Sequence, residues 1–140
     1  LHQARVQAGI KAMAPLGGEV WFKLDRATEA GIRAVNSTRT TMAKVLRNLH
    51  SAAVLCPTWL QTCVFSLDGE PPSVQEQSAY LECVGGLRGA GVALKGVLLY
   101  GVARPSHQPE APRISDVSIA WLDAFAGRIR ALGLPVTVTP

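Results

Sequence analysis

Short apolar runs alternate with stretches of helical composition along this sequence of 140 residues. The apolar runs have the length of buried strands, and each intervening stretch is long enough for a crossover helix. Strict alternation of this kind favours parallel strands joined by right-handed crossovers. The pattern therefore predicts an α/β fold. A doubly wound sheet and a piece of a barrel both satisfy it, and periodicity alone leaves both open.

Turn residues and helix caps divide the chain into elements. A first helix over residues 2–14 is expected to end at Pro15, because proline interrupts the helical hydrogen bonds. Four apolar runs read as strands, and helical stretches separate them. The strands are expected at residues 18–25, 58–67, 94–103 and 134–139. The helices between them are expected at residues 28–55 with a break near Asn36, at 74–91, and from Ser115 or Asp116 to 132.

Polar residues at the expected helix ends support this division. Thr40 or Thr41 can cap the second part of the 28–55 stretch, and Ser73 can cap the helix that follows it. Gly91 and Gly133 stand where the later helices are expected to stop. Local chemistry and hydrophobic pattern therefore indicate the same elements.

The composition is that of one globular domain over residues 1–140, with 48% hydrophobic and 17% charged residues. No run is long enough to span a bilayer, so no membrane association is expected. The mean hydropathy is positive. We therefore expect part of the surface to be covered by a partner or by further chain. The sequence starts at Leu1 and not at Met, which predicts a fragment.

The net charge of +4 comes from scattered basic residues that form no dense block. Aromatic residues are not interleaved with them, so nucleic-acid binding is not expected. The three cysteines, Cys56, Cys63 and Cys83, match no metal-ligand spacing. They indicate a reducing, cytoplasmic setting and small core residues.

Polar residues recur near the carboxyl ends of the expected strands. Lys23 and Asp25 share one face of the first strand by the alternation of side chains, Gln61 lies on the second, and Arg104 follows the third. Buried parallel strands are normally apolar on both faces, and ligands bind at their carboxyl ends. These residues therefore predict a binding site, while ion pairs where the strands meet solvent are the structural alternative.

The segments GEVWFKLD, TWLQTCVF, GVLLYGVARPS and LPVTV, in this order, resemble the carboxyl-terminal half of the radical S-adenosylmethionine (radical SAM) superfamily. The resemblance covers about residues 17 to 139 and is most specific at GVLLYGVARP. It implies the C-terminal half of a partial (β/α)6 TIM-like barrel. It also implies S-adenosylmethionine and a [4Fe-4S] cluster as cofactors of the full-length protein.

The resemblance also implies roles for individual residues. Cofactor-binding candidates are Lys23, Asp25, Gln61, Val102, Ala103 and Arg104. Substrate-side candidates are Tyr100, Cys63 and Ser106. The CxxxCxxC loop that supplies the cluster thiolates in this family is absent from the sequence. We therefore expect those ligands on a missing N-terminal half of the same barrel.

Two functions from different classes follow as expectations. In the first, the chain is part of an enzyme that abstracts hydrogen from a substrate with a 5′-deoxyadenosyl radical, and the isolated chain is inactive. In the second, the chain is a stand-alone, non-catalytic α/β module that binds a ligand or a partner. Neither of these two expected functions indicates which substrate is used.

Overall fold

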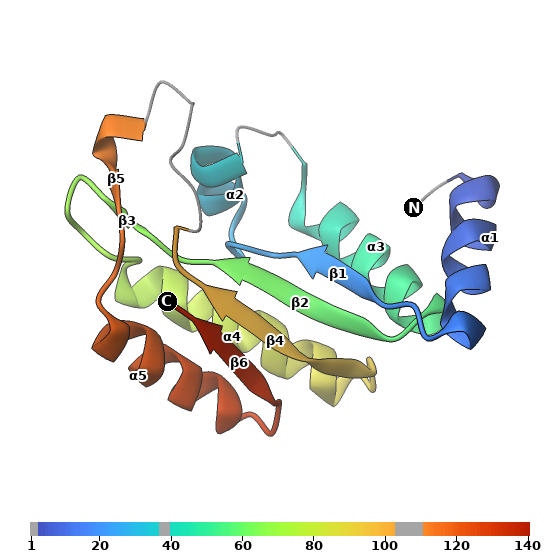
Figure 1. The fold of residues 1–140 in the computed structure, drawn as a ribbon. Coiled ribbons are helices and arrows are strands. Elements are labelled where there is room, and N and C mark those ends of the chain that lie inside the picture. The colour runs from blue at the N-terminus through green and yellow to red at the C-terminus, as the bar shows by residue number, and fades with distance from the viewer. Residues whose placement is uncertain (1–2, 37–39, 103–110) are drawn as a thin grey trace.

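The computed structural model describes residues 3–36, 40–102 and 111–140. A main sheet and five α-helices make up most of this part of the chain (Figure 1). The strands of the sheet are β1 (Val20–Lys23), β2 (Thr58–Cys63), β4 (Leu94–Tyr100) and β6 (Val136–Thr139). The α-helices are α1 (Ala4–Met13), α2 (Glu29–Asn36), α3 (Met42–Leu55), α4 (Val74–Gly89) and α5 (Ile119–Arg130). The short elements are the 3-10 turns Ala14–Leu16 and Ala111–Arg113 and the strands β3 (Ser66–Leu67) and β5 (Ile114–Ser115).

The main sheet is parallel throughout, in the order β1-β2-β4-β6. Each strand of this sheet pairs with the sheet strand that precedes it in the chain. Successive strands are therefore always added at the same edge, and the direction of winding never reverses. A doubly wound sheet reverses its strand order at a switch point, whereas a barrel adds its strands in sequence. The sheet therefore resembles part of a TIM-like barrel, and the α/β expectation is confirmed.

One face of the sheet is buried under helices α3, α4 and α5, which lie along the same side (Figure 1). Leu60, Val97 and Leu99 project from the strands into this core and are fully buried. The helices contribute side chains at helical spacing, as an amphipathic face does. These residues are Leu49, Tyr80, Val84, Leu122, Phe125 and Ile129.

The opposite face of the sheet is only partly covered by the described residues. Trp21 is 60% exposed, although large apolar side chains are usually buried. Trp59, Gln61 and Tyr100 alternate with the core residues of their strands and are half-buried. Parallel sheets are normally covered on both faces. The described part of the chain therefore leaves this face of the sheet more open than is usual for parallel sheets.

Beyond the carboxyl end of β2, the structure differs from the sequence-based expectation. The expected strand at residues 58–67 is divided, and its last part forms β3, which pairs antiparallel with β5. Ser115 belongs to this pair, so α5 begins after Ser118, whose hydroxyl accepts a hydrogen bond from the Trp121 amide. Asp116 instead accepts a hydrogen bond from the Val102 amide at 2.9 Å.

The expected caps of the middle helices are confirmed. The Thr41 hydroxyl accepts a hydrogen bond from the Lys44 amide at the start of α3. Ser73 and Glu76 form a reciprocal capping box at the start of α4. Gly133 follows α5 with a φ of +78°, which favours glycine because other residues are strained there. No described helix combines the length and the apolar character needed to cross a membrane.

Replacing Ser73 by alanine is expected to lower the free energy of unfolding by about 1 kcal/mol, because the amides at the start of α4 lose their acceptor. Ser78, in the middle of the same helix, is the matched control. Ser78→Ala should leave stability unchanged or raise it slightly, because alanine has the higher helix propensity. Urea denaturation of the two variants measures the difference. Equal losses would show that the capping box does not stabilise α4.

Candidate functional site

A cavity of about 830 Å³ lies beyond the carboxyl ends of β1 and β2. Lys23 and Asp25 reach it from the end of β1, and Cys63 reaches it from the end of β2. Its outer wall comes from α2, the β3–β5 pair and the start of α4. Ligands of α/β proteins bind at this end of the strands. The cavity is therefore the candidate site.

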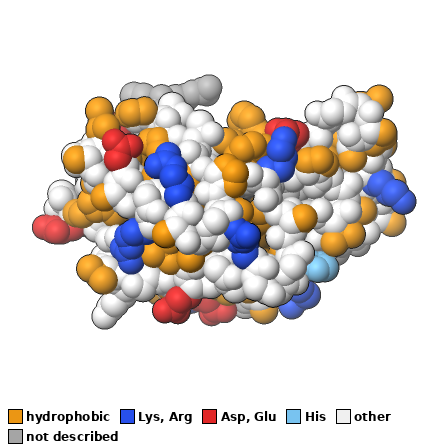
Figure 2. All heavy atoms as spheres, turned by 90° about the horizontal axis from the view of Figure 1, so that it is seen from below, with side chains coloured by type: hydrophobic (Ala, Val, Ile, Leu, Met, Phe, Trp, Pro, Cys, Tyr) orange, Lys and Arg blue, Asp and Glu red, His pale blue; other side chains and the backbone are white. Residues whose placement is uncertain are grey.

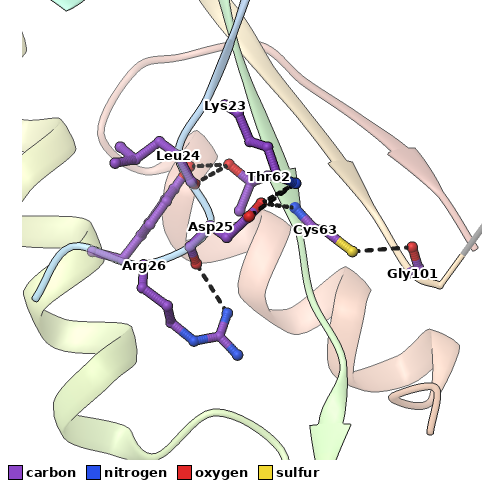
Figure 3. Close-up of polar contacts among 8 residues, drawn as sticks. Lys23, Leu24, Asp25, Arg26, Thr62, Cys63 and Gly101 are labelled. Atoms are coloured by element: carbon purple, nitrogen blue, oxygen red, sulfur yellow. Dashed lines mark hydrogen bonds and ion pairs between the residues drawn. The ribbon is translucent and has the colours of Figure 1, made fainter. Parts of the chain in front are cut away.

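Asp25 is the central polar residue of this site, and it is almost fully buried. Its Oδ1 accepts a hydrogen bond of 2.9 Å from the Cys63 amide, and its Oδ2 lies 2.8 Å from Lys23 Nζ (Figure 3). The carboxylate thus joins the ends of two neighbouring strands. A buried carboxylate is retained only where such donors satisfy it.

Lys23 is the more accessible partner in this pair, with 51% of its side chain exposed. Burial lowers the pKa of its ammonium group, but the hydrogen bond and the negative charge of Asp25 outweigh burial and raise the pKa above its ordinary value. Lys23 therefore remains a cation at neutral pH. It supplies a positive charge at the edge of the cavity.

Cys63 and Tyr100 are paired in the sheet register and lie on its open face. Burial raises the pKa of the Cys63 thiol, and the nearby Asp25 carboxylate raises it further. Burial also raises the pKa of the Tyr100 hydroxyl, against the opposing effect of Lys23. Both groups are therefore neutral at physiological pH. Cys63 Sγ lies 3.5 Å from the Gly101 carbonyl (Figure 3).

A buried hydroxyl network lies on the helix side of the same strands. Thr62 Oγ1 donates to the Leu24 carbonyl at 3.0 Å and lies 2.7 Å from the Tyr80 hydroxyl. Burial raises the pKa of Tyr80, so its hydroxyl stays protonated. These bonds hold the end of β1 against β2 and α4. They therefore position the segment that carries Lys23 and Asp25.

Arg26 is buried immediately after Asp25, although charged residues rarely are. Its Nη1 donates to the Asp25 carbonyl at 2.9 Å, and its Nε lies 3.3 Å from a Glu76 carboxylate oxygen. The guanidinium also lies over the Phe65 ring, 5.4 Å from the centroid. Figure 3 shows Arg26 extending away from the carboxylate of Asp25. It therefore forms a separate polar centre on the outer wall.

The structure brings together part of the set predicted from the sequence. Lys23, Asp25, Cys63 and Val102 all line the cavity. Two further candidates lie on the open face beside them without lining the cavity. These are Gln61, in register with Lys23, and Tyr100, in register with Cys63. Three candidates lie outside the described residues: Ala103, Arg104 and Ser106.

Sequence reasoning did not include the outer wall in the site. Arg26 directly follows a candidate residue, but its partner Glu76 is fifty positions away by number. Phe65 falls inside the expected strand at 58–67, and Arg113 lies just before the expected start of the last helix. The local sequence indicated this wall only through the positive charge of Arg26, which directly follows Asp25. The pairing of β3 with β5 brings the other residues together.

Among the described residues, no group of three or more His, Cys, Asp or Glu side chains could hold a metal ion. Cys56, Cys63 and Cys83 are free thiols on different elements. An iron-sulfur cluster held by cysteines therefore does not fit this part of the chain. On the face drawn in Figure 2, the Lys and Arg side chains lie apart from one another and form no single patch.

Comparison with known proteins gives a likeness in structure only. No protein-family model matches the sequence, and no curated protein matches it. Among solved structures, a radical SAM methyltransferase from Sphaerobacter thermophilus is similar, with a TM-score of 0.64 and 15% sequence identity. The match covers 95% of this chain and 37% of that chain. The fold is therefore similar to that of a segment of this solved protein, and the chain spans little more than a third of its length.

Proposed function

We propose that this chain forms the cofactor- and substrate-facing part of a radical SAM enzyme. The main support is the singly wound parallel sheet, which keeps one face open and carries polar residues at its carboxyl ends. The structural likeness to a radical SAM methyltransferase over 95% of the chain agrees with it. The Asp25 site lies where an α/β barrel binds its ligands.

S-adenosylmethionine, when bound beside a reduced iron-sulfur cluster, supplies the radical that removes hydrogen from a substrate. Lys23 is suited to the methionyl carboxylate, because it is a half-exposed cation at the cavity edge. Asp25 acts as a positioning residue, since its oxygens already accept from Lys23 and Cys63. Gln61, in the register position beside Lys23, can donate to a ribose hydroxyl.

The remainder of the barrel is the proposed partner of this chain. β1 is the first strand of the sheet order, so one of its edges has no neighbour among the described strands. Unpaired edges are usually covered or paired in stable proteins. Trp21, exposed on the open face of β1, would be buried by the same contact. We propose that preceding strands of the same polypeptide pair with β1 and carry the cluster ligands.

Substituting Lys23 by methionine in the full-length protein is expected to weaken S-adenosylmethionine binding about tenfold, because the carboxylate loses a charged partner. Lys95→Met is the matched control. Lys95 is also a half-exposed, ion-paired lysine, but its partner is Glu19 at the amino ends of the strands. The Lys95→Met protein should bind S-adenosylmethionine with the same affinity as the unmodified protein. Isothermal titration after anaerobic reconstitution measures both affinities.

The cluster provides an independent test of the class of enzyme. Full-length protein reconstituted with iron and sulfide under anaerobic conditions should become brown and should cleave S-adenosylmethionine after reduction. A protein that stays colourless and does not bind S-adenosylmethionine would contradict the proposal. That result would favour a non-catalytic α/β binding module instead.

A further inference from the structure

The outer part of the cavity differs chemically from the part next to the sheet. Six apolar side chains larger than alanine line it and come from α2, the segment after β2, β3, β5 and the loop before α4. They are Val35, Phe65, Leu67, Pro71, Pro72 and Ile114. Small-molecule pockets are lined in this way, with a few polar groups that set the orientation of the ligand. The volume of about 830 Å³ is within the range of pockets that hold a small-molecule ligand.

Charged side chains of both signs line the walls of the cavity. Four cationic side chains line it: Lys23, Arg26, Arg33 and Arg113. Three carboxylate side chains also line the cavity: Asp25, Glu70 and Glu76. Asp68, which pairs with Arg113 through two hydrogen bonds, is not part of the wall. Asp68 therefore neutralises Arg113 from behind the wall, and the wall charges without an ion pair among the described residues are Arg33 and Glu70.

Of the four cations of this wall, Arg33 differs from the others. Its guanidinium makes no ion pair and no hydrogen bond with the described residues. It lies in the last turn of α2 and is exposed. A guanidinium group at the rim of an apolar cavity can bind a carboxylate through two parallel hydrogen bonds. Its charge is thus available to a ligand.

Arg26 is a second cation of the outer wall, and it is held rigidly in place. The residue is 7% exposed, and its Nε makes no hydrogen bond within the described part of the chain. The guanidinium is held against Phe65 and Glu76, so its position is fixed before any ligand enters. Glu76 already provides a negative charge 3.3 Å from this Nε, so Arg26 contributes a fixed, ion-paired positive charge to the wall.

We infer that the outer part of the cavity binds an apolar molecule that carries a carboxylate, with Arg33 as its ion-pair partner and Phe65 against its apolar body. The inference rests on the proposed function in one respect: the molecule is the substrate of the enzyme. The binding itself requires only this chain. Glu70 also lines this wall, and its negative charge repels the bound anion.

A charge series of small aromatic probes tests the inference on this chain. Benzoate, benzyl alcohol and benzylammonium have similar size and differ in charge. Benzoate should bind most tightly and benzylammonium least, as measured by ligand-observed NMR titration. Equal affinities, or the reverse order, would overturn the inference, because the wall would then not select an anion.

Three variants assign the binding to named residues. Arg33→Gln should weaken benzoate binding about fivefold and leave benzyl alcohol binding unchanged, because an exposed ion pair contributes up to about 1 kcal/mol. Glu70→Gln should strengthen benzoate binding, because it removes a like charge. Arg47→Gln is the control, since Arg47 is exposed on α3 and does not line the cavity. Unchanged benzoate affinity in Arg33→Gln would overturn the assignment.

The two proposals can fail separately. If benzoate does not bind but the full-length protein carries a cluster and binds S-adenosylmethionine, only the anion site is wrong. If benzoate binds as described but no cluster forms, the anion site holds and its occupant is not the substrate of a radical enzyme.

Discussion

Substitution of Asp25 by alanine is expected to lower the free energy of unfolding by about 3 kcal/mol, because two buried contacts are lost together. The Cys63 amide loses its acceptor at 2.9 Å, and the Lys23 ammonium loses its ion pair. Asp25 is 5% exposed, so water does not replace it at the Cys63 amide without a rearrangement of the strand ends, whereas the half-exposed Lys23 ammonium can be hydrated. Urea denaturation with tryptophan fluorescence measures the change.

Two further variants separate the causes of this loss. Asp25→Asn retains an oxygen that accepts from the Cys63 amide and removes only the charge, so its effect should be smaller than that of Asp25→Ala. Asp123→Ala is the control, because Asp123 is exposed on α5 and its removal should change stability by less than about 0.5 kcal/mol. If Asp25→Ala were as stable as Asp123→Ala, the carboxylate would not join β1 to β2.

The local elements of this fold were predictable because local interactions determine them. Thr41 and Ser73 begin their helices as expected, and each accepts a hydrogen bond from an amide three residues later. The alternation of Leu60 and Thr62 with Gln61 and Cys63 gave the buried and open faces of β2 correctly. The period of two along a strand and the preference for polar N-caps require no knowledge of the rest of the molecule.

The strand order was not predictable from periodicity. A doubly wound sheet and a barrel segment share the same alternation, and they differ only in which strands become neighbours. That choice depends on which side of the sheet α3, α4 and α5 pack, and the spacing of their apolar residues does not determine the side. The resemblance of four segments to a barrel family favoured the arrangement that the sheet order confirms.

The candidate site was predictable only on its sheet side. Lys23 and Asp25 stood out because charges are unexpected at the end of a buried strand. The outer wall depends on contacts between distant residues, such as Arg26 with Glu76 and Arg113 with Asp68. The pairing of β3 with β5 brings Arg113 to Asp68, and the start of α4 brings Glu76 to Arg26. The sequence around each of these four residues does not indicate its partner.

Gly96 leads to the second large prediction, because it is held where a side chain does not fit. Its φ is +155°, and its register partner on β2 is Trp59. A Cβ atom at this position would lie 2.5 Å from the Pro135 carbonyl oxygen and 2.6 Å from the Trp59 ring. The Val97 amide donates to the same carbonyl at 2.9 Å, so Pro135 cannot withdraw without losing a bond between β4 and the start of β6.

Gly96→Ala is therefore expected to lower the free energy of unfolding by about 3 kcal/mol or more, because steric overlap and backbone strain act together. Gly127→Ala is the matched control, since Gly127 lies exposed in α5 and a Cβ there would meet no atom within 4 Å. It should raise stability by about 0.5 to 1 kcal/mol, because alanine favours the helix and restricts the unfolded chain. The same chemical change thus has opposite signs at the two positions. Thermal and urea denaturation of both variants measure this difference, and a stable Gly96→Ala protein would show that β4 does not approach Pro135 and Trp59 this closely.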